Sequence, residues 1–297
     1  MAPRMHDDEI DSDVHLVRHL LEAQQPQWAH LPIQHVSSTG TDNAMYRLGK
    51  DMVVRLPLRP SSIAPADKEH RWVPVLAPHL PLAVPVPLAR GEPIERYPWH
   101  WSVYPWLDGE DATTARFDRP EAAHDLARFI AALQTIDTTG APQPSIANFG
   151  RGVPLAERDE LTRRAIAASR DLIDADAVSA AWETALYATP WDRPSVWVHG
   201  DIAAGNLLVQ DGRLSAVIDW GCLGIGDPAC DLIVAWELFD AASREVLRNE
   251  LEVDDATWAR SRGWAVSTAV MALPYYQHTN PFMSAQARHK IGVVLSE

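Results

Sequence analysis

The hydrophobic pattern changes character near residue 106, and this change most constrains the fold. Short runs with strand character dominate before it: 33–36, 44–48, 52–56 and 101–106. Helical patterns dominate after it: 121–136, most of 157–186, and 231 onward. A chain of 297 residues with 46% hydrophobic residues can bury a core in each of two unequal lobes. We therefore predict an α+β, bilobal chain, with a small β-rich lobe (1–105) and a hinge at its end. A larger helical lobe (106–297) follows.

The bulk composition excludes several classes of partner. A formal net charge of −14 argues against nucleic acid or an anionic membrane, because both favour basic surfaces. Cys222 and Cys230 are too few for a disulfide framework or a zinc site. The acidic N-terminus has no signal-peptide pattern, and the apolar stretch 265–273 is too short to span a bilayer. We expect a cytoplasmic protein and leave its oligomeric state open.

One segment carries a recognisable chemistry. His199-Gly-Asp201 is followed five residues later by Asn206, and Asp219 lies thirteen residues beyond Asn206. Phosphoryl transfer needs a carboxylate facing the acceptor hydroxyl and oxygen ligands for Mg²⁺. A hairpin over 207–218 would bring Asn206 and Asp219 together at its open end. The spacing thus predicts a base and a pair of metal ligands.

This pattern resembles the catalytic and metal loops of the aminoglycoside phosphotransferase family. The shared motifs are His199-Gly-Asp201 with Asn206, Ile218-Asp219-Trp220, and the run from Gly226 to Leu232. The resemblance implies a protein-kinase-like fold and an ATP- or GTP-dependent kinase. It implies Asp201 as catalytic base, Asn206 and Asp219 as Mg²⁺ ligands, and His199 as a scaffold residue of the catalytic loop.

Three polar residues near this motif are better explained by structure than by chemistry. Asp227 precedes a proline and is placed to cap a helix. We expect Asp231 to hold the catalytic loop through backbone hydrogen bonds. We expect His199 to be a hydrogen-bonded core residue rather than an acid or base.

A kinase also needs a cation on a small-lobe strand, paired with a helix carboxylate. The three lysines lie outside that strand: Lys50, Lys68 and Lys290. Arg55 lies inside it, in an Arg-Leu-Pro context found in this family, so we expect Arg55 to replace the lysine. Glu69, on the following helix, is its expected partner. An exposed hairpin charge is the alternative for Arg55.

The remaining nucleotide contacts are less specific in the sequence. The phosphate loop 37–43 has one glycine, Gly40, so backbone amides and hydroxyls would have to contact phosphate there. The segment 101–106 fits the hinge that would hold the adenine base. Pro105 has no N–H, so the donor should be the backbone of Tyr104 or Trp106.

The acceptor is the least constrained part of the prediction. Residues of the C-terminal helices are expected to wall its site: Trp236, Glu237, Asp240, Tyr275, Tyr276 and His278. Carboxylates among them could pair with the ammonium groups of a cationic acceptor. The resemblance favours an aminoglycoside-type antibiotic O-phosphotransferase. A metabolic kinase acting on choline, homoserine or a sugar, and a non-catalytic pseudokinase, stay open as alternatives.

Overall fold

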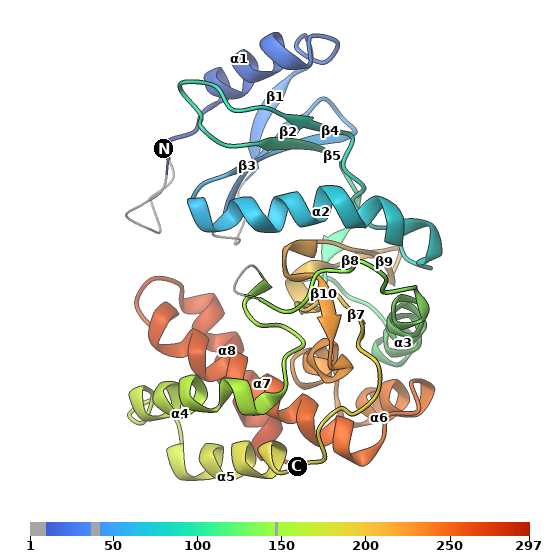
Figure 1. Cartoon of the computed structure of the whole chain (residues 1–297), viewed down its shortest axis with the longest axis vertical. Helices are drawn as coiled ribbons and strands as arrows, with labels where there is room; N and C mark the ends of the chain where they lie inside the picture. Colours follow the sequence, from blue (N-terminus) through green and yellow to red (C-terminus); the bar gives the residue numbers. More distant parts are fainter. Residues whose placement is uncertain (1–9, 37–41, 146–147) are drawn as a thin grey trace. The chain divides into compact units, whose positions relative to one another are not determined.

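The computed structural model describes residues 10–36, 42–145 and 148–297, and the chain divides into two compact units. The first comprises residues 1–78 and 83–108, and the second residues 79–82 and 109–297. The first unit ends at Asp108, just beyond the predicted end at residue 105. Figure 1 labels the α-helices and most of the strands of both units.

The first unit is built on an antiparallel sheet with strand order β1-β2-β3-β5-β4. Its strands are β1 (Ile33–Val36), β2 (Asn43–Leu48), β3 (Met52–Pro57), β4 (Ala89–Gly91) and β5 (Trp101–Pro105). Its α-helices are α1 (Val14–Gln24) and α2 (Ile63–Leu76). The β2–β3 hairpin pairs Asn43 with Pro57 and Leu48 with Met52, as the turn at residues 49–51 predicted.

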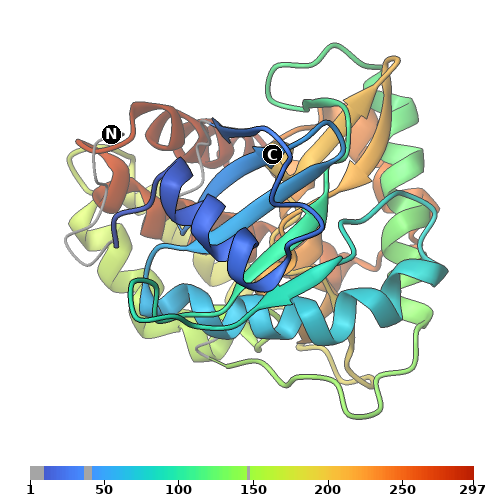
Figure 2. The same cartoon turned by 90° about the horizontal axis from the view of Figure 1, so that it is seen from above.

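The alternation of side chains along β3 divides the two faces of this sheet. Val54 and Leu56 are fully buried in a core that includes Leu20 and Leu21 of α1. Arg55, between them, points to the other face, where it meets Glu69 of α2. Figures 1 and 2 show α1 and α2 on opposite faces of the sheet. The period of two along a strand thus separates an apolar face from a charged one.

The second unit is mainly helical. Its α-helices are α3 (Arg119–Thr135), α4 (Asp159–Ala168), α5 (Ala175–Leu186), α6 (Ala241–Glu250), α7 (Asp255–Tyr276) and α8 (Pro281–Leu295). Short 3₁₀ segments are η4 (Leu155–Arg158), η5 (Ala204–Asn206), η6 (Trp220–Cys222) and η7 (Pro228–Trp236). Its strands are β6 (Glu110–Asp111), β7 (Val196–Val198), β8 (Leu207–Gln210), β9 (Arg213–Val217) and β10 (Gly224–Gly226). The sequence predicted the β8–β9 hairpin, but missed β6 and β10, which are too short to show a period.

Helix α7 is the centre of the second unit. It packs against α4, α5, α8 and η7. Trp264 and Val270 of α7 are fully buried. Gly263 allows the close approach, because a Cβ there would lie 2.7 Å from the Cβ of Ala185 and 2.6 Å from Leu155. Asp254 caps the N-terminus of α7 by accepting from the amide of Thr257 at 2.6 Å.

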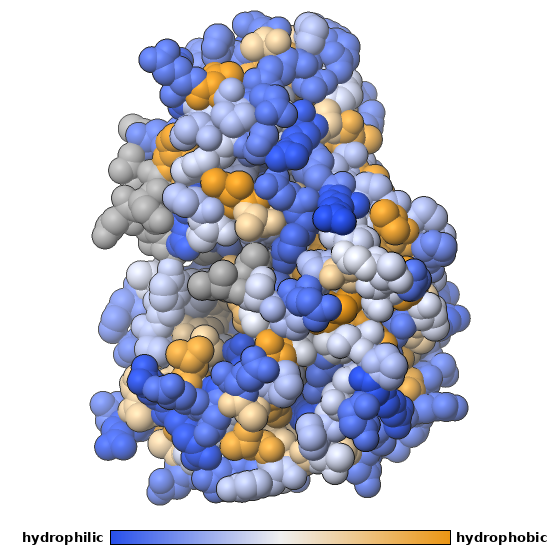
Figure 3. Space-filling model, in the orientation of Figure 1, coloured by the Kyte–Doolittle hydropathy of each residue, from blue (hydrophilic) through white to orange (hydrophobic). Residues whose placement is uncertain are grey.

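In the part of the chain that the structure describes, no helix has both the length and the apolar character needed to span a bilayer. On the face seen in Figure 3, hydrophobic side chains occur singly or in small groups among hydrophilic ones. Exposed apolar residues distributed in this way are usual for protein surfaces.

The close packing of α7 leads to a prediction about the stability of two glycine variants, one of which serves as the control. Gly263→Ala should lower the free energy of unfolding by about 1–3 kcal/mol, because the added methyl overlaps Ala185 in a close-packed core. Gly292→Ala in α8 adds the same methyl where nothing lies within 4 Å. That variant should gain up to about 1 kcal/mol from helix propensity. Urea unfolding of both variants measures the difference, and equal effects would contradict the packing argument.

Candidate functional site

A buried carboxylate holds the loop that follows β7. Asp231, fully buried in η7, accepts the backbone amides of His199 at 2.8 Å and Gly200 at 2.7 Å. Burial raises the pKa of Asp231 to about 7, and the two amide hydrogen bonds oppose that rise. The structural role predicted for Asp231 is therefore confirmed. Asp227 is structural too: it caps η7 through the amide of Ala229 and pairs with Arg260 at 2.6 Å.

His199 joins this loop to the β8–β9 hairpin. Its Nδ1 accepts the backbone amide of Asp201 at 3.2 Å, so Nε2 carries the proton and donates to the carbonyl of Ile218 at 3.2 Å. Burial lowers the pKa of His199, although Asp201 and Asp219 act in the opposite direction, so the ring is neutral near pH 7. The ring is fully buried and packs edge-on against Trp220. Its position suits the expected scaffold role and keeps it from direct contact with a substrate.

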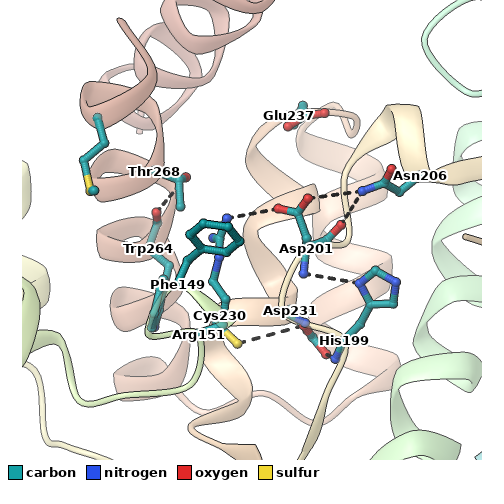
Figure 4. Close-up of polar contacts among 12 residues, drawn as sticks. Phe149, Arg151, His199, Asp201, Asn206, Cys230, Asp231, Glu237, Trp264 and Thr268 are labelled. Atoms are coloured by element: carbon teal, nitrogen blue, oxygen red, sulfur yellow. Dashed lines mark hydrogen bonds and ion pairs between the residues drawn. The ribbon is translucent and has the colours of Figure 1, made fainter. Parts of the chain in front are cut away.

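Asp201 presents a carboxylate that is held at both oxygens. Oδ1 accepts from Nη2 of Arg151 at 3.1 Å, and Oδ2 accepts from Nδ2 of Asn206 at 3.2 Å. The same Nδ2 also donates to the backbone carbonyl of Asp201 at 3.0 Å. Figure 4 shows this arrangement. The side chain of Asp201 is 39% exposed, so an acceptor can reach it.

The hairpin brings the two expected metal ligands to one place. The amide of Ile218 donates to the carbonyl of Asn206 at 2.9 Å, which brings Asp219 next to Asn206. Because Nδ2 of Asn206 is engaged with Asp201, its Oδ1 is the atom left to bind a cation. Asp219 adopts φ 61° and ψ 75°, a left-handed conformation that costs free energy outside glycine and clusters at functional sites.

This set of oxygen donors suits a hard cation. Among the described residues, no group of three or more His, Cys, Asp or Glu side chains could hold a metal by itself. Mg²⁺ needs no such cage, because it takes one or two protein oxygens and completes its shell with phosphate and water. One carboxylate and one amide oxygen therefore fit Mg²⁺ bound together with a nucleotide.

Arg151 is the site residue that sequence reasoning missed. Its side chain is 14% exposed, and it reaches Asp201 from the segment that precedes η4. Burial favours the neutral guanidine, but the negative charge of Asp201 raises the pKa of Arg151 above the ordinary arginine value. The sequence signal that could have drawn attention to Arg151 is its position between two glycines, Gly150 and Gly152. In the structure both glycines have positive φ.

The predicted cation pair forms in the first unit. Nη1 of Arg55 donates to Oε1 of Glu69 at 2.9 Å and to Oε2 at 2.6 Å. Glu69 is 2% exposed and also accepts from the hydroxyl of Tyr104 at 2.6 Å. The alternative of an exposed hairpin charge is wrong, since Arg55 is 13% exposed. The contact is confirmed, and its part in nucleotide binding stays a prediction.

The expected hinge donor at Trp106 is wrong. Its backbone amide donates to the carbonyl of Asp51 at 2.8 Å, which extends the β3–β5 pairing and leaves no N–H for a base. The Trp106 ring instead stacks under the guanidinium of Arg47, 3.8 Å from the ring centroid. A backbone donor at Tyr104 stays a prediction, and Gly40 lies outside the described residues.

Three residues assigned to the acceptor wall have other roles. Trp236 is fully buried and donates to the hydroxyl of Ser261 at 3.0 Å, so it cannot contact a ligand. Asp240 caps α6 by accepting from the amide of Ser243 at 2.9 Å. The hydrophobic pattern alone did not show which face of these segments turns inward.

Glu237, the third, supports the catalytic loop. It is 7% exposed, accepts the backbone amide of Ala204 at 2.9 Å and pairs with Lys290 at 2.8 Å. Burial would raise the pKa of Glu237, but Lys290 and the amide hydrogen bond hold it below the ordinary value. By contrast, Tyr275 is 51% exposed and packs edge-on against Tyr276 at the end of α7, where both remain open to a wall role.

The fold and the loop geometry together define a class, that of the kinase-like small-molecule phosphotransferases. The phosphotransferase enzyme family (APH) matches residues 35–264, and the chain belongs to this family. Aminoglycoside 3'-phosphotransferases from Escherichia coli and Salmonella typhimurium are 26% and 25% identical over 143 residues. These matches cover 46% of this chain and 51% of each relative, so the chain spans about half the length of the curated relatives it matches.

Solved structures agree on the fold over nearly the whole chain. The GDP complex of an aminoglycoside 2'-phosphotransferase-IIIa superposes with a TM-score of 0.74 at 16% identity, covering 96% of this chain and 99% of that one. The macrolide 2'-phosphotransferase MphH from Brachybacterium faecium superposes with a TM-score of 0.63 at 24% identity, covering 95% and 96%. The predicted α+β, kinase-like fold is thereby confirmed.

His70, on the same helix as Glu69, leads to a prediction about how stability depends on pH. Burial, with Arg90 as the next contributor, lowers the pKa of His70 from 6.5 to about 4, and its Nε2 lies 2.6 Å from the hydroxyl of Ser102. Between these two values the unfolded chain binds more protons than the native one, so the free energy of unfolding should fall as the pH drops through this window. His70→Gln, which keeps a hydrogen-bonding group, should lose less stability between about pH 7 and about pH 5. Urea unfolding at both pH values measures this, and parallel losses would contradict the assignment.

Proposed function

We propose that this protein transfers the γ-phosphoryl group of ATP or GTP to a hydroxyl group of a small molecule. The observation that carries the proposal is the carboxylate of Asp201, 39% exposed and held at both oxygens, with Asn206 bonded to it and Asp219 next to Asn206 at the end of the hairpin. Asp201 would orient the acceptor hydroxyl and accept its proton, while the hydroxyl oxygen bonds to phosphorus and the bond to the leaving diphosphate breaks. Family membership supports this reaction class.

The residues around Asp201 divide the remaining work. Oδ1 of Asn206 and the carboxylate of Asp219 would hold Mg²⁺, which neutralises phosphate charge when it is bound. In the first unit, Arg55 offers a permanent positive charge for the α- and β-phosphates, and Glu69 and Tyr104 fix its direction. A pseudokinase is the less favoured alternative, because base, ligand pair and cation are all present with suitable partners.

An aminoglycoside-type antibiotic is our first proposal for the acceptor, supported by the matched family and its aminoglycoside 3'-phosphotransferase relatives. A second candidate is an acceptor with a large apolar face and fewer cationic groups than an aminoglycoside, as a macrolide has. Two observations favour it. The carboxylates of Glu237 and Asp240 are engaged by protein groups, which leaves fewer anions for ammonium groups. Phe149 and Met271 are 54% and 39% exposed, and Arg158 donates to the backbone carbonyl of Phe149 and to the sulfur of Met271.

A panel of acceptors tests the activity and separates the two candidates. The protein is incubated with MgATP and one acceptor at a time: aminoglycosides, macrolides, choline or simple sugars. The mass of each product is measured by mass spectrometry. We expect one class to gain a phosphoryl group. Asp201→Asn should slow the transfer about 100-fold or more while ATP still binds, because the carboxylate acts in the transition state.

The outcomes of this panel are distinct. Phosphorylated aminoglycosides would support the first candidate, and phosphorylated macrolides the second. Transfer at an undiminished rate by Asp201→Asn would remove Asp201 from the mechanism. ATP binding without transfer to any acceptor or to water would favour a pseudokinase.

The metal assignment has its own test. Asp219→Ala should weaken Mg²⁺-dependent nucleotide binding about tenfold or more, since it removes the one charged protein ligand proposed for the cation. Calorimetric titration of ATP with and without Mg²⁺ gives the affinity. Asp211→Ala, which removes an acidic residue at the closed end of the same hairpin, is the matched control. Equal Mg²⁺ dependence in Asp219→Ala and the wild type would exclude the ligand role.

A further inference from the structure

The environment of Arg151 is unusual for an arginine. Its Nη2 binds Oδ1 of Asp201, while its Nε and Nη1 are buried with no oxygen or nitrogen partner among the described residues. The thiol of Cys222 adds electrostatic attraction and a side-chain hydrogen bond, which is weak because sulfur is a poor acceptor. Burying a guanidinium with unsatisfied N–H groups costs free energy, and a single ion pair compensates for it only in part. Stability of the fold alone is therefore a poor explanation for this side chain.

The backbone around Arg151 is built to deliver it to Asp201. Gly200, one residue before Asp201, has φ 82°, and a Cβ there would lie 3.0 Å from the Cβ of Arg151 and 2.5 Å from the carbonyl of Cys222. The stem of Arg151 thus crosses the catalytic loop at a point that only glycine permits. On the other side, Asn148 donates to the carbonyl of Arg151 at 3.1 Å.

The next residue fastens the segment to the core. The carbonyl of Gly152 accepts the backbone amide of Asp227 at 2.9 Å. A Cβ on Gly226 would lie 2.2 Å from that same carbonyl, so this contact too requires glycine. Arg151 is fixed from both ends, and its direction toward Asp201 does not depend on a mobile surface rotamer.

We propose that Arg151 is a positioning residue for phosphoryl transfer: it fixes the direction of the Asp201 carboxylate from one oxygen while Asn206 fixes it from the other. With Oδ1 bound to Arg151, rotation of the carboxylate about its Cβ–Cγ bond is blocked. Oδ2 is thereby kept beside the ligand pair at the open end of the hairpin. This inference rests on the proposed function, because it assigns a task in that reaction to a residue outside the recognised motifs.

The geometry leads to a specific non-additivity. If Arg151 acts only through Asp201, its removal should matter only while Asp201 is present. Arg151→Met should lower kcat for MgATP turnover, with water or a panel acceptor, by about 100-fold, the cost of a misplaced catalytic group. KM for MgATP should stay nearly constant. In an Asp201→Asn background the same substitution should cost nothing further.

Two more variants separate positioning from loss of structure. Arg151→Lys keeps a cation and should recover part of kcat, though not all, because an ammonium cannot present the fork of a guanidinium. Arg260→Met removes a buried arginine that pairs with Asp227, with side chains 4% and 3% exposed. It should lower Tm without a matching fall in kcat of the folded protein.

The outcomes decide the proposal as follows. Additive losses in the double variant, or a fall in kcat of equal size in Arg260→Met, would overturn it in favour of a structural role. Absence of any turnover by the wild type would be a failure of the proposed function instead. In that case a crystal structure of Arg151→Met still decides the inference: a carboxylate of Asp201 that turns from its wild-type direction supports it, and an unchanged one overturns it.

Discussion

The site depends on one buried carboxylate that accepts two backbone amides. Asp231 binds the N–H groups of His199 and Gly200, and this fixes the loop at the residue before Asp201. An unpaired amide at this depth would cost about 1–3 kcal/mol, so the loop cannot leave Asp231 without a penalty. The loop in turn positions the neutral ring of His199, and the hydrogen bond from this ring to the carbonyl of Ile218 positions the hairpin. The base and the metal ligands thus share one frame.

In each unit, buried carboxylates among the described residues are engaged by protein groups. Glu237 is bound to the amide of Ala204 and to Lys290, so α8 supports the catalytic loop from its far side. In the first unit, Glu69 is bound to Arg55 and Tyr104. Buried carboxylates that are paired in this way orient other groups and do not attract ligands. The acidic net charge of the chain therefore says little about the charge of its acceptor. The exposed side chains of Phe149 and Met271 are the more informative feature.

The sequence predicted those parts of the site that depend on local spacing. The distances from Asp201 to Asn206 and Asp219 are set by one turn and one hairpin, and the pairing of Arg55 with Glu69 follows from strand alternation and the next helix. Predictions that depended on tertiary packing had different outcomes: the hydrogen bonds of Asp231 to the loop are confirmed, whereas the roles expected for Trp236 and Trp106 are wrong. Trp236 is apolar and could have faced either a ligand or the core, and the Trp106 amide was taken by Asp51, a partner that no local pattern identifies. Arg151 lies fifty residues before Asp201, and only the folded chain brings the two together.

Backbone conformations that are costly elsewhere gather around Asp201. Gly152 and Gly200 have positive φ, and Asp219 has a left-handed conformation although it carries a side chain. Although this unit is rich in helices, the residues proposed for the chemistry lie on irregular segments. Buried carboxylates hold these segments in place. Positive φ costs glycine little, but the conformation of Asp219 is costly and persists only when its surroundings over-determine it. The amides on Asp231, the ring of His199 and the stem of Arg151 supply that determination. The free-energy cost of preorganising Asp201 is therefore met when the loops fold, before any substrate binds.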